Sequence, residues 1–176
     1  PNTGGKTVLL KALALCSLML QSGIPAPVGA ESSVPCFDDM FADIGDEQSI
    51  SANLSTFSWH ITNIAAIDRQ LDTPALVLFD EVGSGTDPVE GGALGMAVID
   101  HFRQRGATII ATTHYDTLKT YASTTPGVAC AAFGFLPQSY EPTYKLLYGT
   151  PGTSLALEMA EKYGLAPAII AAARSY

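Results

Sequence analysis

Positive charge is scarce in this sequence. Nine lysines and arginines stand against 17 acidic residues, which gives a net charge of −8 over 176 residues. A domain that binds phosphate backbones by itself needs a concentrated basic face. The composition therefore argues against a stand-alone nucleic-acid binder, and we expect any nucleic-acid contact to lie elsewhere.

Cysteine is also scarce. Cys16, Cys36 and Cys130 are odd in number, far apart, and form no Cys-x-x-Cys pair. Disulfide frameworks and zinc sites need paired or closely spaced cysteines, so neither is supported. A reducing cytoplasm is the expected location.

The sequence has no uninterrupted apolar run of the roughly 20 residues that span a bilayer. The first apolar run ends at Leu20 and is interrupted by Lys11 and Ser17, and the sequence begins without methionine. Lys6 and Val28-Gly29-Ala30 nevertheless leave open a signal peptide and an exported binding protein. We favour the intracellular alternative and expect no membrane contact.

Apolar residues are plentiful, at 47% against 15% charged, which is enough to bury the core of one domain. Helical spacing predicts a first helix from Gly5 to Gln21, with Gly23 as its C-cap. Its apolar positions include Leu9, Leu13, Cys16 and Leu20. A second helix is expected to open at Ser55-Thr56 and to run to about Gln70, whereas residues 34–41 are ambiguous.

A continuous apolar run over residues 75–79 predicts a strand buried on both faces. Asp87, Pro88 and Glu90 then read as N-cap, N1 and N3 of a helix that closes at Gly106, before a second buried strand over residues 108–112. Strand, helix and strand predict a crossover in a parallel sheet, hence an α/β fold. The later elements expected are strands over 128–135 and 144–148 and helices around 155–162 and 168–175.

The first seven residues, Pro1-Asn2-Thr3-Gly4-Gly5-Lys6-Thr7, complete all but the opening glycine of the phosphate-loop pattern G-x-x-x-x-G-K-[ST]. Backbone N–H groups of such a loop surround the β-phosphate, Lys6 would reach the β and γ oxygens, and the Thr7 hydroxyl would ligate Mg²⁺. A glycine-rich turn that merely starts a helix is the alternative.

Two carboxylates, Asp80 and Glu81, follow the strand over residues 75–79. Ligands of open α/β sheets bind at the carboxyl ends of strands, beside the phosphate loop. Asp80 would therefore hold Mg²⁺, directly or through water, and Glu81 would orient and deprotonate the attacking water. A solvated acidic pair that ends a strand is the alternative.

Three further features are open to a structural or a functional reading. His114 follows the next strand and should emerge at the same edge as Glu81, where it would sense the γ-phosphate. Ser55, as a helix N-cap, leaves N–H donors for an anion. Gly83 to Asp87 is by itself a flexible turn into a capped helix.

Together these segments resemble the MutS family of dimeric, ABC-type ATPases over essentially the whole chain. The resemblance rests on the phosphate loop and on residues 44–49 (Ile-Gly-Asp-Glu-Gln-Ser), 54–58 (Leu-Ser-Thr-Phe-Ser) and 80–88 (Asp-Glu-Val-Gly-Ser-Gly-Thr-Asp-Pro), with Glu90-Gly91. Thr86-Asp87-Pro88 is more typical of the bacterial MutS-two branch than of the mismatch-repair branch.

The resemblance implies a phosphate-loop (P-loop) NTPase fold with ATP and Mg²⁺ as cofactors, completed only in a homodimer. Ser55 and Thr56 would belong to the signature loop that contacts the γ-phosphate of the partner subunit, Thr86-Asp87 would cross between subunits, and His114 would be the switch histidine. The last two helices resemble a helix-turn-helix that clasps the neighbouring domain. A DNA-reading role is the alternative, but Lys162 and Arg174 supply little positive charge.

The sequence departs from the family pattern at its start, because the first glycine and the strand before it are absent. We expect a fragment of a larger protein, with an exposed sheet edge or a substitute strand and with weak or absent nucleotide binding on its own. Residues 1–152 would form the ATPase core and residues 153–176 the helix-turn-helix.

The expected function is ATP hydrolysis that opens and closes a homodimer on branched DNA, held by regions outside the fragment. By resemblance the parent suppresses homologous recombination, with ribosome rescue as a further role in this branch, and it carries a C-terminal nuclease-type domain. A mismatch-repair MutS and a non-catalytic dimerisation module that binds nucleotide are the alternatives.

Overall fold

The computed structural model describes residues 5–45, 53–136, 138–150, 152 and 155–175, with the backbone alone for residues 53–56. The chain divides into two compact units. One is Lys6–Tyr121, and the other combines Pro1–Gly5 with Ala122–Tyr176. The predicted boundary between residues 152 and 153 stays a prediction.

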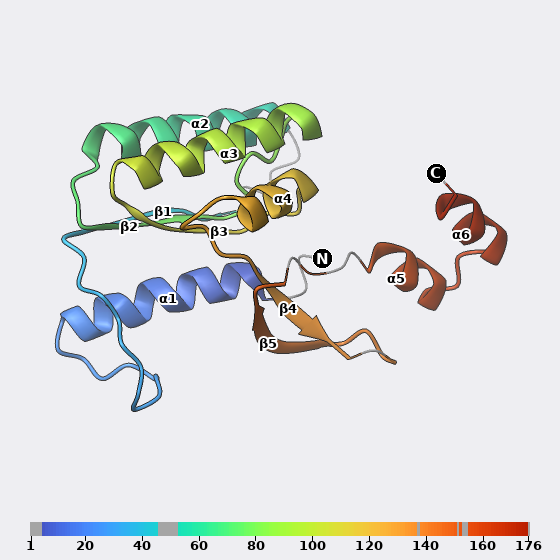
Figure 1. The fold of residues 1–176 in the computed structure, drawn as a ribbon, viewed down its shortest axis with the longest axis horizontal. Helices are drawn as coiled ribbons and strands as arrows, with labels where there is room; N and C mark the ends of the chain where they lie inside the picture. Colours follow the sequence, from blue (N-terminus) through green and yellow to red (C-terminus); the bar gives the residue numbers. More distant parts are fainter. Residues whose placement is uncertain (1–4, 46–52, 137, 151, 153–154, 176) are drawn as a thin grey trace. The chain divides into compact units, whose positions relative to one another are not determined.

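The unit Lys6–Tyr121 is built on a three-stranded parallel sheet of order β1-β2-β3. Figure 1 shows α1 on one face of this sheet and α2 and α3 on the other. The predicted α/β class, with a parallel sheet flanked by helices, is therefore confirmed. The elements are α1 (Lys6–Gln21), β1 (Asp39–Asp43), α2 (Asn53–Gln70), β2 (Ala75–Phe79), α3 (Pro88–Gln104), β3 (Thr108–Ala111) and α4 (Asp116–Thr124).

Strand β2 is the centre of the core, and all five of its residues are buried. Its side chains alternate between two hydrophobic clusters, as strand geometry requires. Val77 and Phe79 pack among residues of α2 and α3, and the rings of Phe79 and Phe102 lie 5.5 Å apart. Leu76 and Leu78 pack with Leu10 of α1 on the opposite face. The predicted strand buried on both faces is confirmed.

Helix α3 begins as the sequence predicts. The Asp87 side chain accepts hydrogen bonds from the N–H groups of Val89 and Glu90, with Pro88 at the first helical position. The chain leaves the helix through Gly106 at φ 86°, a left-handed conformation that favours glycine. The N-cap at Asp87 fixes the point at which the loop after β2 ends and α3 begins.

Some local predictions need correction. Helix α1 buries Leu10 and Ser17, and Ala14 packs beside Leu10. The apolar positions predicted to face the core include Leu13 and Leu20, which are more than one third exposed. Because this helix is apolar almost all round, its periodicity could not select the buried face. Helix α2 begins at Asn53, so Ser55 lies in its first turn and is not its N-cap.

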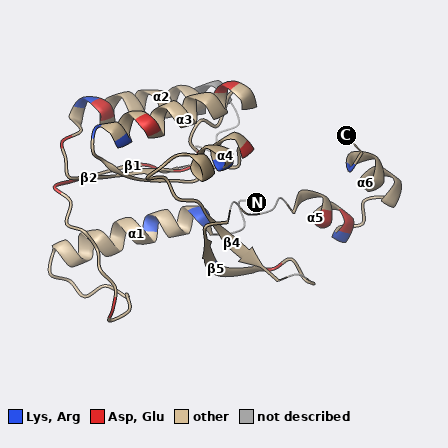
Figure 2. Ribbon diagram, in the orientation of Figure 1, with Lys and Arg blue, Asp and Glu red and all other residues tan. Residues whose placement is uncertain are grey.

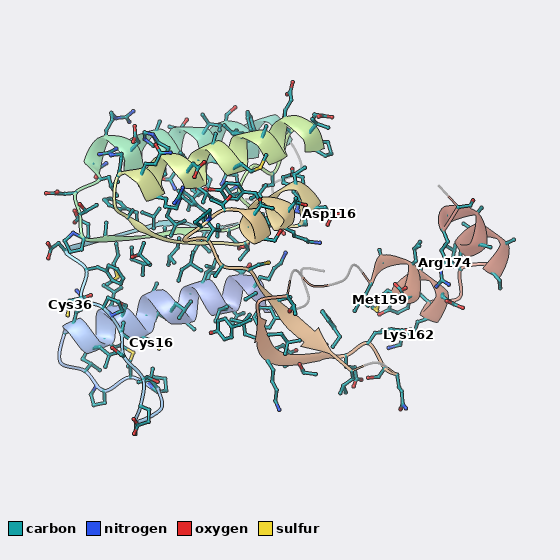
Figure 3. All side chains as sticks on the ribbon, in the orientation of Figure 1. Cys16, Cys36, Asp116, Met159, Lys162 and Arg174 are labelled. Atoms are coloured by element: carbon teal, nitrogen blue, oxygen red, sulfur yellow. The ribbon has the colours of Figure 1, made fainter. Side chains whose placement is uncertain are left out.

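The unit with Ala122–Tyr176 contains an antiparallel pair, β4 (Ala131–Phe135) and β5 (Pro142–Tyr148), and two short helices, α5 (Ala156–Lys162) and α6 (Pro167–Ala173). Arg174 follows α6 and lies 3.9 Å from Glu158 and 3.6 Å from Glu161 of α5. Figure 3 labels Arg174 beside this helix pair. Arg174 is therefore engaged with carboxylates of its own chain.

Basic residues are scattered over several elements and are not gathered on one (Figure 2). None of the helices in the described part of the chain is both long and apolar enough to cross a bilayer. The apolar run near the start of the sequence is helix α1, which contributes Leu10 to the core with no exposed surface.

Candidate active site

The candidate site lies at the carboxyl edge of the parallel sheet. Asp43 is the last residue of β1, Asp80 follows β2, and Thr112 follows β3. The ladder continues past the strand ends, since the Asp80 N–H donates to the Asp43 carbonyl at 2.9 Å and the Thr112 N–H donates to the Phe79 carbonyl at 2.9 Å. Three polar residues thus lie at one edge of the sheet.

The start of α1 reaches this same edge. The Thr7 hydroxyl donates to Oδ2 of Asp80 at 2.5 Å, and Lys6 Nζ lies 4.0 Å from Oε1 of Glu81. Lys6 and Thr7 of the predicted phosphate loop therefore lie beside the predicted acidic pair. Asp80 is 8% exposed, whereas the side chains of Lys6 and Glu81 are 21% and 25% exposed. One carboxylate is buried, and the other remains open to a ligand and to water.

Thr112 connects the two carboxylate residues. Its hydroxyl donates to Oδ1 of Asp80 at 2.5 Å and accepts from the Glu81 N–H at 2.8 Å. Glu81 has φ 52°, a left-handed conformation that is unusual for a residue with a side chain. Such a conformation persists where the surroundings fix it, and the contact with Thr112 is one such restraint.

Tyr115 supports the loop that follows Glu81. Its side chain belongs to the core cluster, and its hydroxyl donates to the Gly83 carbonyl at 3.1 Å. Burial, together with the negative charges of Glu81 and Asp87, raises the pKa of the Tyr115 phenol. The His114 ring packs on Tyr115, with ring centroids 4.3 Å apart. His114 is exposed and follows β3, at the edge where it was expected.

Asp43 forms a second polar cluster next to the site. It is 2% exposed, and its carboxylate lies 2.7 Å from Nδ1 of His60 and accepts from Asn63 at 2.8 Å. Both partners are on α2, so the pair ties this helix to the end of β1. Since the Asp43 carbonyl also accepts the Asp80 N–H, the cluster is continuous with the site through the backbone.

Not every predicted site residue can be located. Pro1, Asn2, Thr3 and Gly4 lie outside the described residues, and Gly5 has φ 90°, as expected of a glycine before a helix. Ser55 and Thr56 lie in the first turn of α2, and nothing is described of their side chains. The Asp87 side chain caps α3 within its own chain. The predicted roles of these residues stay predictions.

Sequence reasoning missed Thr112, Tyr115 and the Asp43 cluster. The signal for Thr112 and Tyr115 was their position close to His114, just after β3. The prediction that this strand is buried was wrong, because its residues are exposed or only partly buried. Nothing in the sequence showed that their hydroxyl groups contact residues about 30 positions earlier. Asp43 ends β1, which begins within residues 34–41, whose sequence pattern is ambiguous, and extends two residues beyond them.

Comparison with known proteins covers the whole chain. Residues 1–176 match the family described as MutS domain V. The chain is 52% identical over 174 residues to a protein of Exiguobacterium sibiricum named Endonuclease MutS2, covering 99% of this chain and 22% of that protein. It is 52% identical over 176 residues to the Endonuclease MutS2 of Clostridioides difficile, covering 100% of this chain and 22% of the relative. The protein of the same name from Brevibacillus brevis is 53% identical over 174 residues, with coverage of 99% and 22%.

Proposed function

The chain belongs to the MutS family, in which it corresponds to domain V, and we propose that it binds and hydrolyses ATP at the carboxyl edge of its parallel sheet. The observation that carries this proposal is the meeting of Lys6 and Thr7 with Asp80 and Glu81. A P-loop NTPase fold is part of the proposal, because residues 1–7, which end in the first turn of α1, complete all but the opening glycine of the phosphate-loop pattern.

In this proposal the start of α1 binds the triphosphate. The free N–H groups and the positive dipole end of a helix N-terminus favour a phosphate group. Lys6 adds a cation that is only 21% exposed, so its charge is less screened than that of a surface lysine. Its 4.0 Å separation from Glu81 puts the phosphate-binding cation beside the proposed base.

The residues present fit a magnesium ion. Thr7 and Asp80 offer a hydroxyl and a carboxylate oxygen 2.5 Å apart, and hard oxygen ligands are those that Mg²⁺ prefers. Within the described ranges no group of three or more His, Cys, Asp or Glu residues forms an all-protein cage. Mg²⁺ is usually bound through one or two protein groups and completed by phosphates and water, so Thr7 and Asp80 are the protein ligands of this proposal. When bound, the ion would neutralise charge on the β and γ oxygens.

Glu81 is the proposed general base. Its carboxylate is partly open to solvent, and its backbone is fixed by the contact of its N–H with Thr112. A carboxylate in this position accepts a proton from a water that lies in line with the phosphoryl group. His114, after the neighbouring strand, is proposed to sense the γ-phosphate from the same edge.

The dimeric part of the proposal rests on the family resemblance. Ser55 and Thr56 would contact the γ-phosphate bound by a second copy, and Asp87 would lie in a loop that crosses between the copies. The last two helices, proposed as a helix-turn-helix, would clasp the partner. The contact of Arg174 with Glu158 and Glu161 supports a protein-binding element over a DNA-reading one, because it offsets the positive charge near α5.

The chain spans about 22% of the length of the curated relatives it matches, so the activity of the whole protein is a wider proposal. We propose a cytoplasmic homodimer that binds branched DNA through other regions and suppresses homologous recombination. A role on the ribosome and a nuclease elsewhere in the whole protein belong to the same proposal, the latter in line with the relatives' name. The identity to MutS2 proteins favours this branch over mismatch repair.

The test is Glu81→Gln in the full-length protein. The amide keeps the shape of the side chain but cannot accept a proton as a base, so ATP binding should persist while turnover falls by about 10²-fold or more. Unchanged turnover would exclude Glu81 as the base. A wild-type protein that binds ATP without hydrolysing it would favour the non-catalytic dimerisation module.

A further inference from the structure

The segment that follows β3 holds the Glu81 loop at three points. The Thr112 hydroxyl accepts the Glu81 N–H at 2.8 Å, and the Thr112 carbonyl accepts the Val82 N–H at 3.1 Å. Further along, the Tyr115 hydroxyl donates to the Gly83 carbonyl at 3.1 Å. Two residues of one short segment therefore contact the loop on both sides of its left-handed turn.

The loop needs such restraint. Glu81 has φ 52°, and Gly83 and Gly85 have φ 81° and 87°. The left-handed conformation costs conformational energy at Glu81, which has a side chain. The two glycines adopt it without strain, but their backbone has many other accessible conformations. A carboxylate that must orient a water requires a fixed backbone, since small displacements of a reacting group reduce the rate strongly.

Tyr115 combines an anchored ring with a polar end at the loop. It is 8% exposed and packs in the core cluster of α2, α3 and β2. A phenol with the ordinary pKa of 10.0 is protonated, and therefore a donor, throughout the neutral range, and burial raises the pKa of Tyr115 further. Gly91 of α3 approaches both the Gly83 carbonyl and the Tyr115 hydroxyl so closely that a side chain at position 91 would collide with them. The hydroxyl thus lies in a tightly packed space.

We propose that Tyr115 is a positioning residue for the reaction, whose hydroxyl fixes the loop that carries Glu81. This inference rests on the proposed ATP hydrolysis and adds a residue for which we have inferred no other role. Tyr115 acts through Gly83 and does not itself meet the phosphates in this proposal. It also joins His114 to the loop, because the His114 ring packs on its own ring.

The position of Tyr115 predicts which kinetic constant it affects. Lys6 and Thr7 hold the nucleotide in the proposal, and the contacts described for them are with Glu81 and Asp80, not with Tyr115. Loss of the hydroxyl should therefore lower kcat and leave KM for ATP nearly unchanged. A residue with a purely structural role would instead change stability and both constants together, or neither constant.

The test compares Tyr115→Phe with Tyr121→Phe in the full-length protein. Both variants lose one hydroxyl and keep the ring, and the Tyr121 hydroxyl donates to Asp100 at 2.6 Å, between α4 and α3. Since a neutral hydrogen bond is worth about 1 kcal/mol, Tyr115→Phe should lower kcat about fivefold, with KM within about twofold. Tyr121→Phe should leave kcat unchanged.

Amide hydrogen exchange supplies a second measurement. The Val82 and Ser84 N–H groups donate within the loop region, to Thr112 and Glu81, and should exchange faster in Tyr115→Phe than in Tyr121→Phe. Wild-type kcat in Tyr115→Phe, or an equal fall in both variants, would overturn the inference while leaving the proposed function intact. Absence of turnover in the wild type would overturn both the proposed ATP hydrolysis and the role of Tyr115. Glu81→Gln tests the proposed base independently of Tyr115.

Discussion

The Thr7 hydroxyl donates a hydrogen bond to the Asp80 carboxylate at 2.5 Å, although 73 residues separate the two in sequence. Thr7 is the second residue of α1, and Asp80 directly follows β2. The contact brings the last residue of the phosphate-loop pattern to the first residue of the acidic pair. The proposed magnesium ligands are thus already adjacent in the folded chain.

This contact predicts the effect of Asp80→Asn. The amide is nearly isosteric but offers one neutral oxygen, and its NH₂ group competes for the positions of the Thr7 and Thr112 hydroxyl groups. The Mg²⁺ concentration for half-maximal ATPase activity should rise by roughly tenfold or more. Loss of a residue that supports a metal site typically lowers metal affinity by at least this factor. Titration of Mg²⁺ at saturating ATP measures it, and an unchanged dependence would remove Asp80 from the metal site.

The elements predicted correctly are those whose signal is local. Five consecutive apolar residues mark β2, and Asp87, Pro88 and Glu90 mark the start of α3 within four positions. Strand β1 has the sequence Asp-Met-Phe-Ala-Asp, which is short and bounded by acids. It is a strand because it pairs with β2 along its whole length, and that pairing is not written in its own residues.

In the site, too, the residues that belong to local sequence patterns were predictable and the others were not. Lys6, Thr7, Asp80 and Glu81 belong to contiguous patterns with a known geometry, so their meeting at one sheet edge could be expected. The contacts of Thr112 and Tyr115 depend on the register of β3 against β2 and on the path of the Glu81 loop. A hydroxyl after a strand has no periodicity that would show which carbonyl or carboxylate it meets.

The proposed dimer predicts complementation between two defective variants. Ser55→Ala should impair hydrolysis without preventing ATP binding by a single copy, whereas a Lys6→Ala variant should not bind the triphosphate. If Ser55 acts on the nucleotide of the partner, a mixed dimer contains one site with both defects and one intact site. Each mixed dimer should therefore recover up to about half of the activity of a wild-type dimer. Verified mixed dimers without any recovered activity would contradict the trans arrangement.

Gly91 predicts a packing effect on the loop. A Cβ at this position would overlap the Gly83 carbonyl and the Tyr115 hydroxyl, so Gly91→Ala should destabilise the domain by about 1–3 kcal/mol. Turnover should fall as well, because the displaced atoms hold the Glu81 loop. Gly29→Ala is the matched control, since its Cβ would meet only Ser32 at an ordinary 3.6 Å. Equal urea midpoints for the two variants would show that the close approach is not tight.

The Asp43 cluster predicts a large loss of stability in Asp43→Ala. Removal of one partner from a buried polar cluster leaves His60 and Asn63 without the carboxylate, at a cost of about 3 kcal/mol. Asp38→Ala, at an exposed position just before β1, should cost less than about 0.5 kcal/mol. Urea unfolding of both variants measures the difference, and similar values would mean that the cluster does not hold α2 to β1.

Asp68 predicts how stability depends on acid. A hydrogen bond from His101 holds the pKa of the Asp68 carboxyl below its ordinary value of 3.8, with a further contribution from Arg105. These contacts join α2 to the end of α3, with His101 Nε2 at 2.6 Å and Arg105 in direct contact with the carboxylate. Because the pKa is lower in the folded state, the unfolded chain takes up a proton first as the pH falls.

The stability that Asp68 contributes is therefore fully present well above pH 3.8 and is lost as the pH falls through 3.8 toward the lower pKa of the folded state. Unfolding free energies of the wild type and Asp68→Asn should differ by a constant amount near neutral pH. That difference should shrink through the acid range, so the variant has the flatter acid limb. A difference that stays constant down to pH 3 would show that the contacts with His101 and Arg105 do not favour the ionised carboxylate.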